Sequence, residues 1–193
     1  MSQDKKEEIL AKAVHLFLTK GYEKASMRDL GKAVGIQAPG LYHYFKNKKE
    51  ILQQINDDSW QKFHDMILDE AKKVADPEEK IKLYIRNMIK YQFVLAEKTL
   101  IVDDSIPIKH IKGRREEERV VFCFLRDTLR ELAETKGLRN DIDLTLAAFT
   151  LFSMVARIYK WYKPNGRLNL EELTEQVIRV FLYGFYGREE VRE

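Results

Sequence analysis

Apolar residues recur at intervals of three and four positions along most of this 193-residue chain, which is the spacing of one face of an α-helix. The first helix is predicted over residues 4–20, and Gly21 ends it because glycine readily adopts the left-handed conformation that follows many helices. Four apolar residues share its inner face: Ile9, Ala13, Leu16 and Phe17. No segment shows a convincing strand pattern, so the periodicity predicts an all-α protein.

Residues 26–45, SMRDLGKAVGIQAPGLYHYF, predict two short helices joined by a tight turn. Ser26 is a favoured N-cap residue, because its hydroxyl can accept a hydrogen bond from a backbone N–H of the first turn. Leu30 and Ala33 are spaced to share the inner face of the first helix. Gly35 then follows as the residue that ends this helix.

The second helix of this stretch is predicted to begin near Ala38–Pro39, where proline is tolerated because first-turn N–H groups have no helical partner. Leu41 and Phe45 are predicted to point inward. Five residues lie nearer the outer side: Gln37, Gly40, Tyr42, His43 and Tyr44. This pattern is typical of a helix-turn-helix, whose second helix enters the major groove of DNA. An ordinary helical hairpin in a bundle is the alternative.

Six further helices are predicted, beginning with a long one that Asn47 caps and that runs to about Val74. Asp76–Pro77 marks a break and the start of the next. The others are a short helix and loop over residues 100–112, a helix over 114–136, one from Asp141 or Asp143 to about Lys163, and one from about Asn169. We therefore expect a three-helix DNA-binding domain over residues 1–47 and a six-helix ligand-binding and dimerisation domain over residues 48–193.

The last two helices are too apolar for one small bundle to bury. The final helix carries five large apolar residues: Leu173, Val177, Val180, Phe181 and Phe185. Because a helix that is apolar all round must be buried on all sides, we expect a homodimer joined by a four-helix interface. A dimer places two recognition helices roughly 34–36 Å apart, which predicts a palindromic operator.

Charge and composition agree with a DNA-binding protein. Residues 1–50 contain ten Lys and Arg against six Asp and Glu, a net charge of +4, whereas the whole chain carries +3. The positive excess thus lies with the helix-turn-helix, as neutralisation of DNA phosphates requires. The chain begins without a signal-peptide pattern and has no apolar run long enough to span a membrane, so we expect a cytoplasmic protein.

The sequence gives little sign of a disulfide, a metal site or a catalytic site. The single cysteine, Cys123, excludes an intrachain disulfide and a multi-cysteine zinc site. The four histidines are scattered, and no catalytic constellation is recognisable. We therefore expect no metal, no cofactor and no enzymatic activity. An enzyme or a plain protein-interaction bundle is the alternative of a different class, and sequence-dependent DNA binding that an effector abolishes would exclude both.

The stretch from Ser26 to Phe45, continued through KNKKEIL (residues 46–52), resembles the DNA-binding signature of TetR-type transcriptional repressors. The run LYHYF followed by KNK carries the resemblance, which covers about the first fifty residues. Gln37 departs from it, since the family more often has a better capping residue such as Ser there. The resemblance implies that Tyr42, His43 and Lys48 contact phosphates, with Arg28 beside them.

Base contacts follow from the chemistry of the recognition helix. The Gln37 amide suits a base edge, Ala38 or Pro39 suits a thymine methyl group, and Gly40 allows close approach of the backbone. The predicted DNA-binding residues are Arg28, Gln37, Ala38, Pro39, Gly40, Tyr42, His43, Tyr44 and Lys48. The alternatives are packing for Tyr44, simple hydration for His43, and a generic charged face for Lys48.

Residues 156–176, ARIYKWYKPNGRLNLEELTEQ, resemble the end of TetR-type repressors that respond to acyl-CoA thioesters. Arg157 and Trp161 are spaced to share one helix face, where a guanidinium suits phosphate oxygens and an indole can cover an adenine or an acyl chain. Alternatively, Trp161 plugs the dimer interface and Arg157 pairs with an acid. The predicted effector-binding residues are Arg157, Trp161, Phe93, Tyr91, Phe124 and Phe152.

The favoured effector is therefore a medium- or long-chain acyl-CoA that links the protein to fatty-acid metabolism. A cluster that could hold the CoA phosphates, or simply form a charged helix start, comprises Lys109, His110, Lys112, Arg114 and Arg115. The alternative is a drug-like effector that controls an efflux or detoxification gene. In either case we expect the ligand to favour a spacing of recognition helices that no longer matches successive major grooves.

Overall fold

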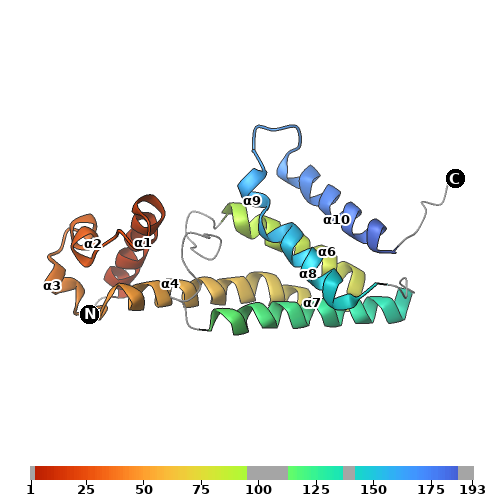
Figure 1. The fold of residues 1–193 in the computed structure, drawn as a ribbon, viewed down its shortest axis with the longest axis horizontal. Coiled ribbons are helices and arrows are strands. Elements are labelled where there is room, and N and C mark those ends of the chain that lie inside the picture. Colours follow the sequence, from red (N-terminus) through yellow and green to blue (C-terminus); the bar gives the residue numbers. More distant parts are fainter. Residues whose placement is uncertain (1–2, 95–112, 137–141, 187–193) are drawn as a thin grey trace. The chain divides into compact units, whose positions relative to one another are not determined.

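The computed structural model describes residues 3–94, 113–136 and 142–186 (Figure 1). Every regular element within these residues is a helix, so the predicted all-α class is confirmed. No helix among them is both long and apolar enough to cross a membrane. The predicted helix and loop over residues 100–112 lie outside the described residues.

The chain divides into two compact units. The first comprises residues 1–62 and 94–114, and the second comprises residues 63–93 and 115–193. Most of the long helix after Asn47 thus clusters with the helices that precede it. The expected domain boundary after residue 47 stays a prediction.

Four helices of the first unit surround one apolar core: α1 (Gln3–Lys20), α2 (Met27–Val34), α3 (Ala38–Leu41) and α4 (Lys48–Phe63) (Figure 1). The core includes Ile9, Phe17, Leu30, Leu41 and Leu52, each at most 1% exposed. The predicted inner faces of the first and third helices are therefore confirmed. A helix-turn-helix over α2 and α3 is present, as the sequence predicts.

The predicted inner face of α2 is partly wrong. Ala33 is exposed, whereas Val34 is buried together with Leu30 and Gly31. The backbone N–H of Ile36 donates to the carbonyl of Gly31 at 2.9 Å, so the turn folds back onto this side of the helix. The face that carries Gly31 therefore packs inward.

The long helix predicted from Asn47 to about Val74 is confirmed, with an irregular stretch inside it. The Asn47 side chain accepts from the N–H of Glu50 at 2.9 Å and so caps α4. The helix continues through a π-helical segment, η1 (His64–Asp69), into α5 (Glu70–Lys72). In a π-helical segment each N–H pairs with the carbonyl five residues earlier, and side chains of neighbouring helices can add further bonds to its carbonyls. The Asn87 side chain from α6 (Pro77–Val94) supplies one by donating to the carbonyl of Met66 at 2.9 Å.

The second unit also contains α7 (Arg114–Lys136), α8 (Leu144–Ala156), α9 (Ile158–Trp161) and α10 (Leu170–Tyr186). The bounds predicted for α7 are confirmed. Asp143 caps α8 by accepting from the N–H of Leu146 at 2.7 Å. Asn169 caps α10 in the same way, accepting from the N–H of Glu172 at 2.9 Å. Local capping residues therefore fix the starts of these helices, as predicted.

The predicted continuous helix from Asp143 to about Lys163 is wrong, because the chain breaks between α8 and α9 at Arg157. Arg157 has φ −120° and ψ 15°, outside the α-helical range. In an unbroken helix the N–H of Tyr159 would donate to the carbonyl of Val155, four residues earlier. Gln92 of α6 takes this place instead, since its Oε1 accepts from Tyr159 N–H at 3.2 Å and its Nε2 donates to Val155 O at 2.7 Å.

Gln92 is completely buried, and its Nε2 also donates to the carbonyl of Met88 at 3.1 Å. The Gln92 amide thus lies between the carbonyl of Val155 and the N–H of Tyr159 and replaces the helical hydrogen bond that would join them. The break between α8 and α9 therefore depends on a residue more than sixty positions earlier in the chain.

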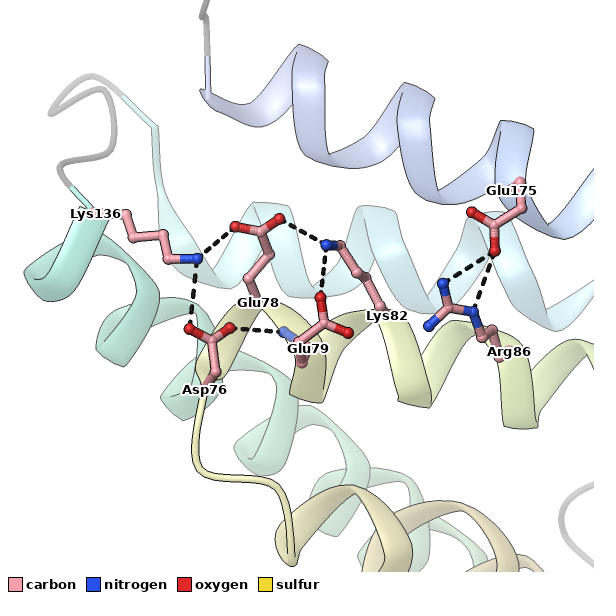
Figure 2. Close-up of polar contacts among 7 residues, drawn as sticks. All are labelled: Asp76, Glu78, Glu79, Lys82, Arg86, Lys136 and Glu175. Carbon is pink, nitrogen blue, oxygen red and sulfur yellow. Dashed lines mark hydrogen bonds and ion pairs between the residues drawn. The ribbon is translucent and has the colours of Figure 1, made fainter.

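Ion pairs join the ends of the helices in the second unit (Figure 2). Lys136, at the end of α7, lies 2.7 Å from Glu78 and 3.4 Å from Asp76, at the start of α6. Asp76 also accepts from the N–H of Glu79 at 2.9 Å, which holds the pKa of its carboxyl below the ordinary value. The hydrogen bond that Lys136 donates to Glu78 correspondingly raises the pKa of the Lys136 ammonium. These contacts fix where α6 starts against the end of α7.

A second ion pair in Figure 2 joins α6 to α10. The Arg86 guanidinium donates to one oxygen of Glu175 through Nη2 at 3.0 Å and Nε at 3.2 Å. Both side chains are largely solvated, so the pair aligns the two helices more than it stabilises them.

Large apolar side chains remain exposed on α8 and α10, which contact each other. Leu146 and Val180 are each 65% exposed, and Phe149 and Tyr183 are about half exposed. Leu173, Val177 and Phe181 of α10 are buried, so the single chain covers only part of the apolar surface that the sequence predicts for this helix. The side chain of Phe185 lies outside the described residues. The exposed residues define an apolar face of Leu146, Phe149, Val180 and Tyr183.

Candidate nucleic-acid interface and effector surface

Reciprocal hydrogen bonds hold the start of α2. The Ser26 hydroxyl accepts from the N–H of Asp29 at 3.1 Å, and the Asp29 carboxylate accepts from the N–H of Ser26 at 3.0 Å. Such a capping box satisfies two N–H groups at a helix start. Lys20 of α1 adds an ion pair to Asp29 at 2.7 Å. The hydrogen bond from Lys20, followed by those from Ser26, holds the pKa of Asp29 well below its usual range.

The turn between α2 and α3 has the geometry that the sequence predicts. Gly35 adopts φ 72°, a left-handed conformation that favours glycine. Gln37 occupies the N-cap position of α3 in an extended conformation, but its side chain makes no capping hydrogen bond. Its exposed amide is therefore not used to start the helix.

Most of the predicted DNA-binding residues lie in or next to α3 and are at least partly exposed, whereas the two residues predicted to point inward are buried. Leu41 and Phe45 are 0% and 2% exposed, as predicted. The exposed members of the set are Arg28, Gln37, Pro39, Tyr42 and His43, and the partly buried ones are Ala38, Gly40, Tyr44 and Lys48. Helix α3 is a single turn, so the residues from Tyr42 onward follow it in a turn. Contacts of these nine residues with DNA stay predictions.

Tyr44 and Lys48 also have partners within the protein. Tyr44 packs against the apolar core of the first unit, which matches the packing alternative. The Lys48 ammonium donates to the carbonyl oxygens of Tyr22 at 2.6 Å, Ala25 at 2.9 Å and Glu23 at 3.3 Å. Lys48 is thus engaged in the link between α1 and α2.

Four of the predicted effector-binding residues lie in the second unit, each against another aromatic ring. Tyr91 is 1% exposed and meets Phe63 edge to face at 5.8 Å between ring centroids. The other three pairs are Phe93 with Tyr162 at 5.1 Å, Phe124 with Tyr84 at 6.2 Å, and Phe152 with Phe122 at 5.1 Å. The structure therefore places these aromatics in packed contacts and does not test whether they bind a ligand.

Arg157 and Trp161 do not share a continuous helix face, which corrects the prediction. Arg157 is the residue at which the helix breaks, and Trp161 ends the short helix α9. Both side chains are exposed, Trp161 by 58%. Lys109, His110 and Lys112 of the predicted phosphate-binding cluster lie outside the described residues, as does the side chain of Arg114.

A groove of about 360 Å³ runs between α7 and α8 in the second unit. It is lined by Arg115, Glu118, Arg119, Phe122, Cys123, Arg126, Thr145, Ala148 and Phe149. The Phe122 ring lies against Phe149, with 4.0 Å between their centroids. The groove thus combines an apolar floor with three guanidinium groups and one carboxylate. Of these three arginines only Arg115 was predicted from the sequence as a ligand contact, although Arg119 and Arg126 follow on the same side of one helix.

No group of three or more potential metal ligands gathers among the residues that the structure describes. Among the residues that the structure describes, the Tyr84 hydroxyl is the one buried side-chain polar atom that has no hydrogen-bond partner. Burial raises the pKa of this phenol above its ordinary value.

Two family models match the chain. Residues 9–55 match bacterial regulatory proteins of the tetR family, and residues 74–185 match the tetracyclin repressor-like C-terminal domain. The first match covers the helix-turn-helix, and the second covers the helices that carry the groove.

Individual relatives are similar along almost the whole chain. The HTH-type transcriptional repressor KstR2 of Mycolicibacterium smegmatis is 24% identical over 191 residues, which cover 93% of this chain and 90% of the relative. The fatty acid metabolism regulator protein of Bacillus subtilis is 20% identical over 187 residues, or 94% and 95% of the two chains. The crystal structure of AibR in complex with isovaleryl coenzyme A and operator DNA has a TM-score of 0.80 at 26% identity, covering 91% and 97%. The first two relatives are named as a transcriptional repressor and a metabolism regulator.

Proposed function

Because this chain belongs to the tetR family of bacterial regulatory proteins, we propose that this DNA-binding repressor leaves its operator when an acyl-CoA thioester binds its second unit. The observation that carries the choice of an acyl-CoA as effector is the likeness over nearly the whole chain to AibR, which was crystallised with isovaleryl coenzyme A and operator DNA. The fatty acid metabolism regulator among the relatives points in the same direction.

The chemistry of the second unit suits such a ligand. Acyl-CoA carries phosphates, an adenine and an apolar chain in one molecule. Guanidinium groups pair well with phosphate oxygens, and the groove between α7 and α8 offers Arg115, Arg119 and Arg126. Phe122 and Phe149 line the same groove, and the predicted aromatics on α6, α7 and α8 would supply further apolar surface for the acyl chain. Arg157 and Trp161 are exposed beside the break after α8, where they could meet the rest of the ligand.

We propose that DNA is contacted by the outer side of the helix-turn-helix. Gln37 would offer its amide to a base edge, with Ala38, Pro39 and Gly40 in apolar or close backbone contact. Arg28, Tyr42, His43 and Tyr44 would face the phosphates. The exposure of Gln37 and Tyr42 and the absence of a capping role for the Gln37 amide support this assignment.

We expect Gln37→Ala to weaken binding to the native operator by roughly tenfold, since a side-chain contact to a base edge contributes about 1–3 kcal/mol of discrimination. Binding to unrelated DNA should change little. The measurement is fluorescence anisotropy on both DNAs at one salt concentration. Tyr42→Phe is the matched comparison, because loss of a phosphate contact should weaken both DNAs alike. If Gln37→Ala lowered the affinity for both DNAs equally, Gln37 would not contribute to base recognition.

A homodimer is part of the proposal. The apolar face of Leu146, Phe149, Val180 and Tyr183 on α8 and α10 exposes about half or more of each side chain, and groups of exposed apolar residues often mark protein–protein interfaces. A second copy covering this face would give the four-helix interface and two recognition helices for a palindromic operator. Ligand binding would then favour a dimer whose recognition helices no longer match successive major grooves.

We expect lauroyl-CoA, but neither lauric acid nor free CoA, to release the protein from DNA upstream of its own gene. Only the intact thioester presents both the phosphates and the apolar chain. Fluorescence anisotropy of labelled DNA, titrated with the three compounds in parallel, measures the release. Tight binding that is indifferent to all three would contradict the acyl-CoA proposal and favour a drug-like effector.

A further inference from the structure

We propose that Lys48 is a positioning residue of the DNA-binding unit, which uses its charge to hold the link before α2 against the start of α4 rather than to neutralise a phosphate. This inference rests on DNA binding but not on the identity of the effector. It differs from the phosphate contact that the sequence resemblance implies for Lys48.

The surroundings of the Lys48 ammonium leave no donor for DNA. A lysine ammonium has three N–H donors and no acceptor. In this structure the three nearest acceptors are the backbone carbonyls of Tyr22, Ala25 and Glu23, at 2.6, 2.9 and 3.3 Å. The Tyr22 ring lies over the same group, with its centroid 4.3 Å from Nζ, and adds a cation–π contact. A phosphate contact would require breaking this arrangement.

The position of Lys48 in the helix also calls for an internal partner. Lys48 is the first residue of α4, where the helix dipole disfavours a positive charge. Three carbonyl oxygens directed at the ammonium offset that cost. Lys49, the next residue, is exposed and provides the comparison within the same helix start.

The link that Lys48 holds controls the direction of α2. The carbonyls of Tyr22 and Ala25 belong to the irregular segment between Gly21 and the capping residue Ser26. Tyr22 also packs edge to face on Phe17 of α1, with 5.2 Å between the ring centroids. Lys48 therefore joins α1, the link and α4 at one point, directly before the helix-turn-helix begins. Loss of the contact should loosen the orientation of α2 and α3 against α4.

The test is operator and non-specific DNA binding of Lys48→Met across a range of salt concentrations. Methionine keeps the length of the side chain and removes its charge and donors. We expect operator affinity to fall by roughly tenfold to a hundredfold, as expected for losing hydrogen bonds to a charged group, while non-specific affinity changes little. The slope of log Kd against log salt should stay within about 0.3 of the unmodified protein, since a slope change of about 0.9 is expected for each lost phosphate contact.

Lys49→Met is the matched control, because it removes the same charge one residue away without touching the link. It should leave the ratio of operator to non-specific affinity unchanged. Lys48→Gln, which retains two N–H donors, is the second variant if Lys48→Met is unfolded by circular dichroism, and it should recover part of the operator affinity. A fall of about 0.9 in the slope together with equal losses on both DNAs would overturn the proposal and restore a phosphate contact.

Discussion

Replacement of both Leu146 and Val180 by glutamate is expected to separate the dimer and to weaken operator binding by roughly 100-fold to 10,000-fold. Each side chain is 65% exposed in the single chain, so the substitutions should not disturb its own core. In the proposed dimer both carboxylates would lie within an apolar interface, where an unpaired charge is costly. A monomer binds one half-site at a time and loses the gain from linking two recognition helices, which is of this order.

Sedimentation velocity gives the oligomeric state, and anisotropy on the full operator and on an isolated half-site gives the affinities. Affinity for the half-site should hardly change. Val120→Glu is the matched control, since Val120 is a partly exposed apolar residue on α7, outside this face. A double variant that stays dimeric at micromolar concentration would show that α8 and α10 do not form the interface through Leu146 and Val180.

Gln92→Glu is expected to lower the free energy of unfolding by about 3–5 kcal/mol at neutral pH, the range for an uncompensated buried charge. The carboxylate would replace an amide that is completely buried and that donates to the carbonyls of Val155 and Met88. Both carbonyls would then lose a donor and face a negative charge. The acceptor for the N–H of Tyr159 would be kept.

The effect should depend on pH with a definite sign. Burial raises the pKa of the new carboxyl in the folded state above its unfolded value of about 4.3. Its contribution to stability is therefore most favourable below about pH 4 and is lost as pH rises through the raised folded-state pKa. Urea unfolding at pH 4.5 and 7.5, at one protein concentration, should show the deficit relative to the unmodified protein growing with pH. Gln61→Glu, at an exposed position of α4, should show almost no deficit. A deficit that is the same at both pH values would exclude a buried carboxylate at position 92.

Two features that the sequence did not predict are contacts between residues far apart in the chain. Periodicity predicted one helix through Arg157, because neither glycine nor proline marks the break. The break instead depends on Gln92, which lies on another helix. Nothing in the sequence around Gln92 indicates that its side chain bonds to the backbone near Arg157. From the sequence, Lys48 is expected to contact a phosphate or to lie on a charged face. Its hydrogen bonds to the carbonyls of Tyr22 and Ala25 become visible only in the folded first unit.

Exposure on a helix face was also only partly predictable. Ala33 satisfies the helical spacing of an inner face, yet it is exposed, and Val180 on the largely apolar helix α10 is exposed in the single chain. Spacing identifies which residues share a side of a helix, but the neighbouring elements determine how far that side is covered. For Val180 the missing cover is the surface that we assign to a second copy.

The sequence by itself determined the helical class, the helix-turn-helix and the starts of most helices. Ser26, Asn47, Asp143 and Asn169 cap helices through bonds to N–H groups three residues later, and Gly35 ends one through its own backbone conformation. Such interactions are complete within one turn and need no other part of the fold. The tertiary structure alone decided the break after α8, the partners of Lys48 and the arginine-lined groove. Each of these brings together groups from different helices, whose positions follow from the packing of the whole unit and not from any local pattern.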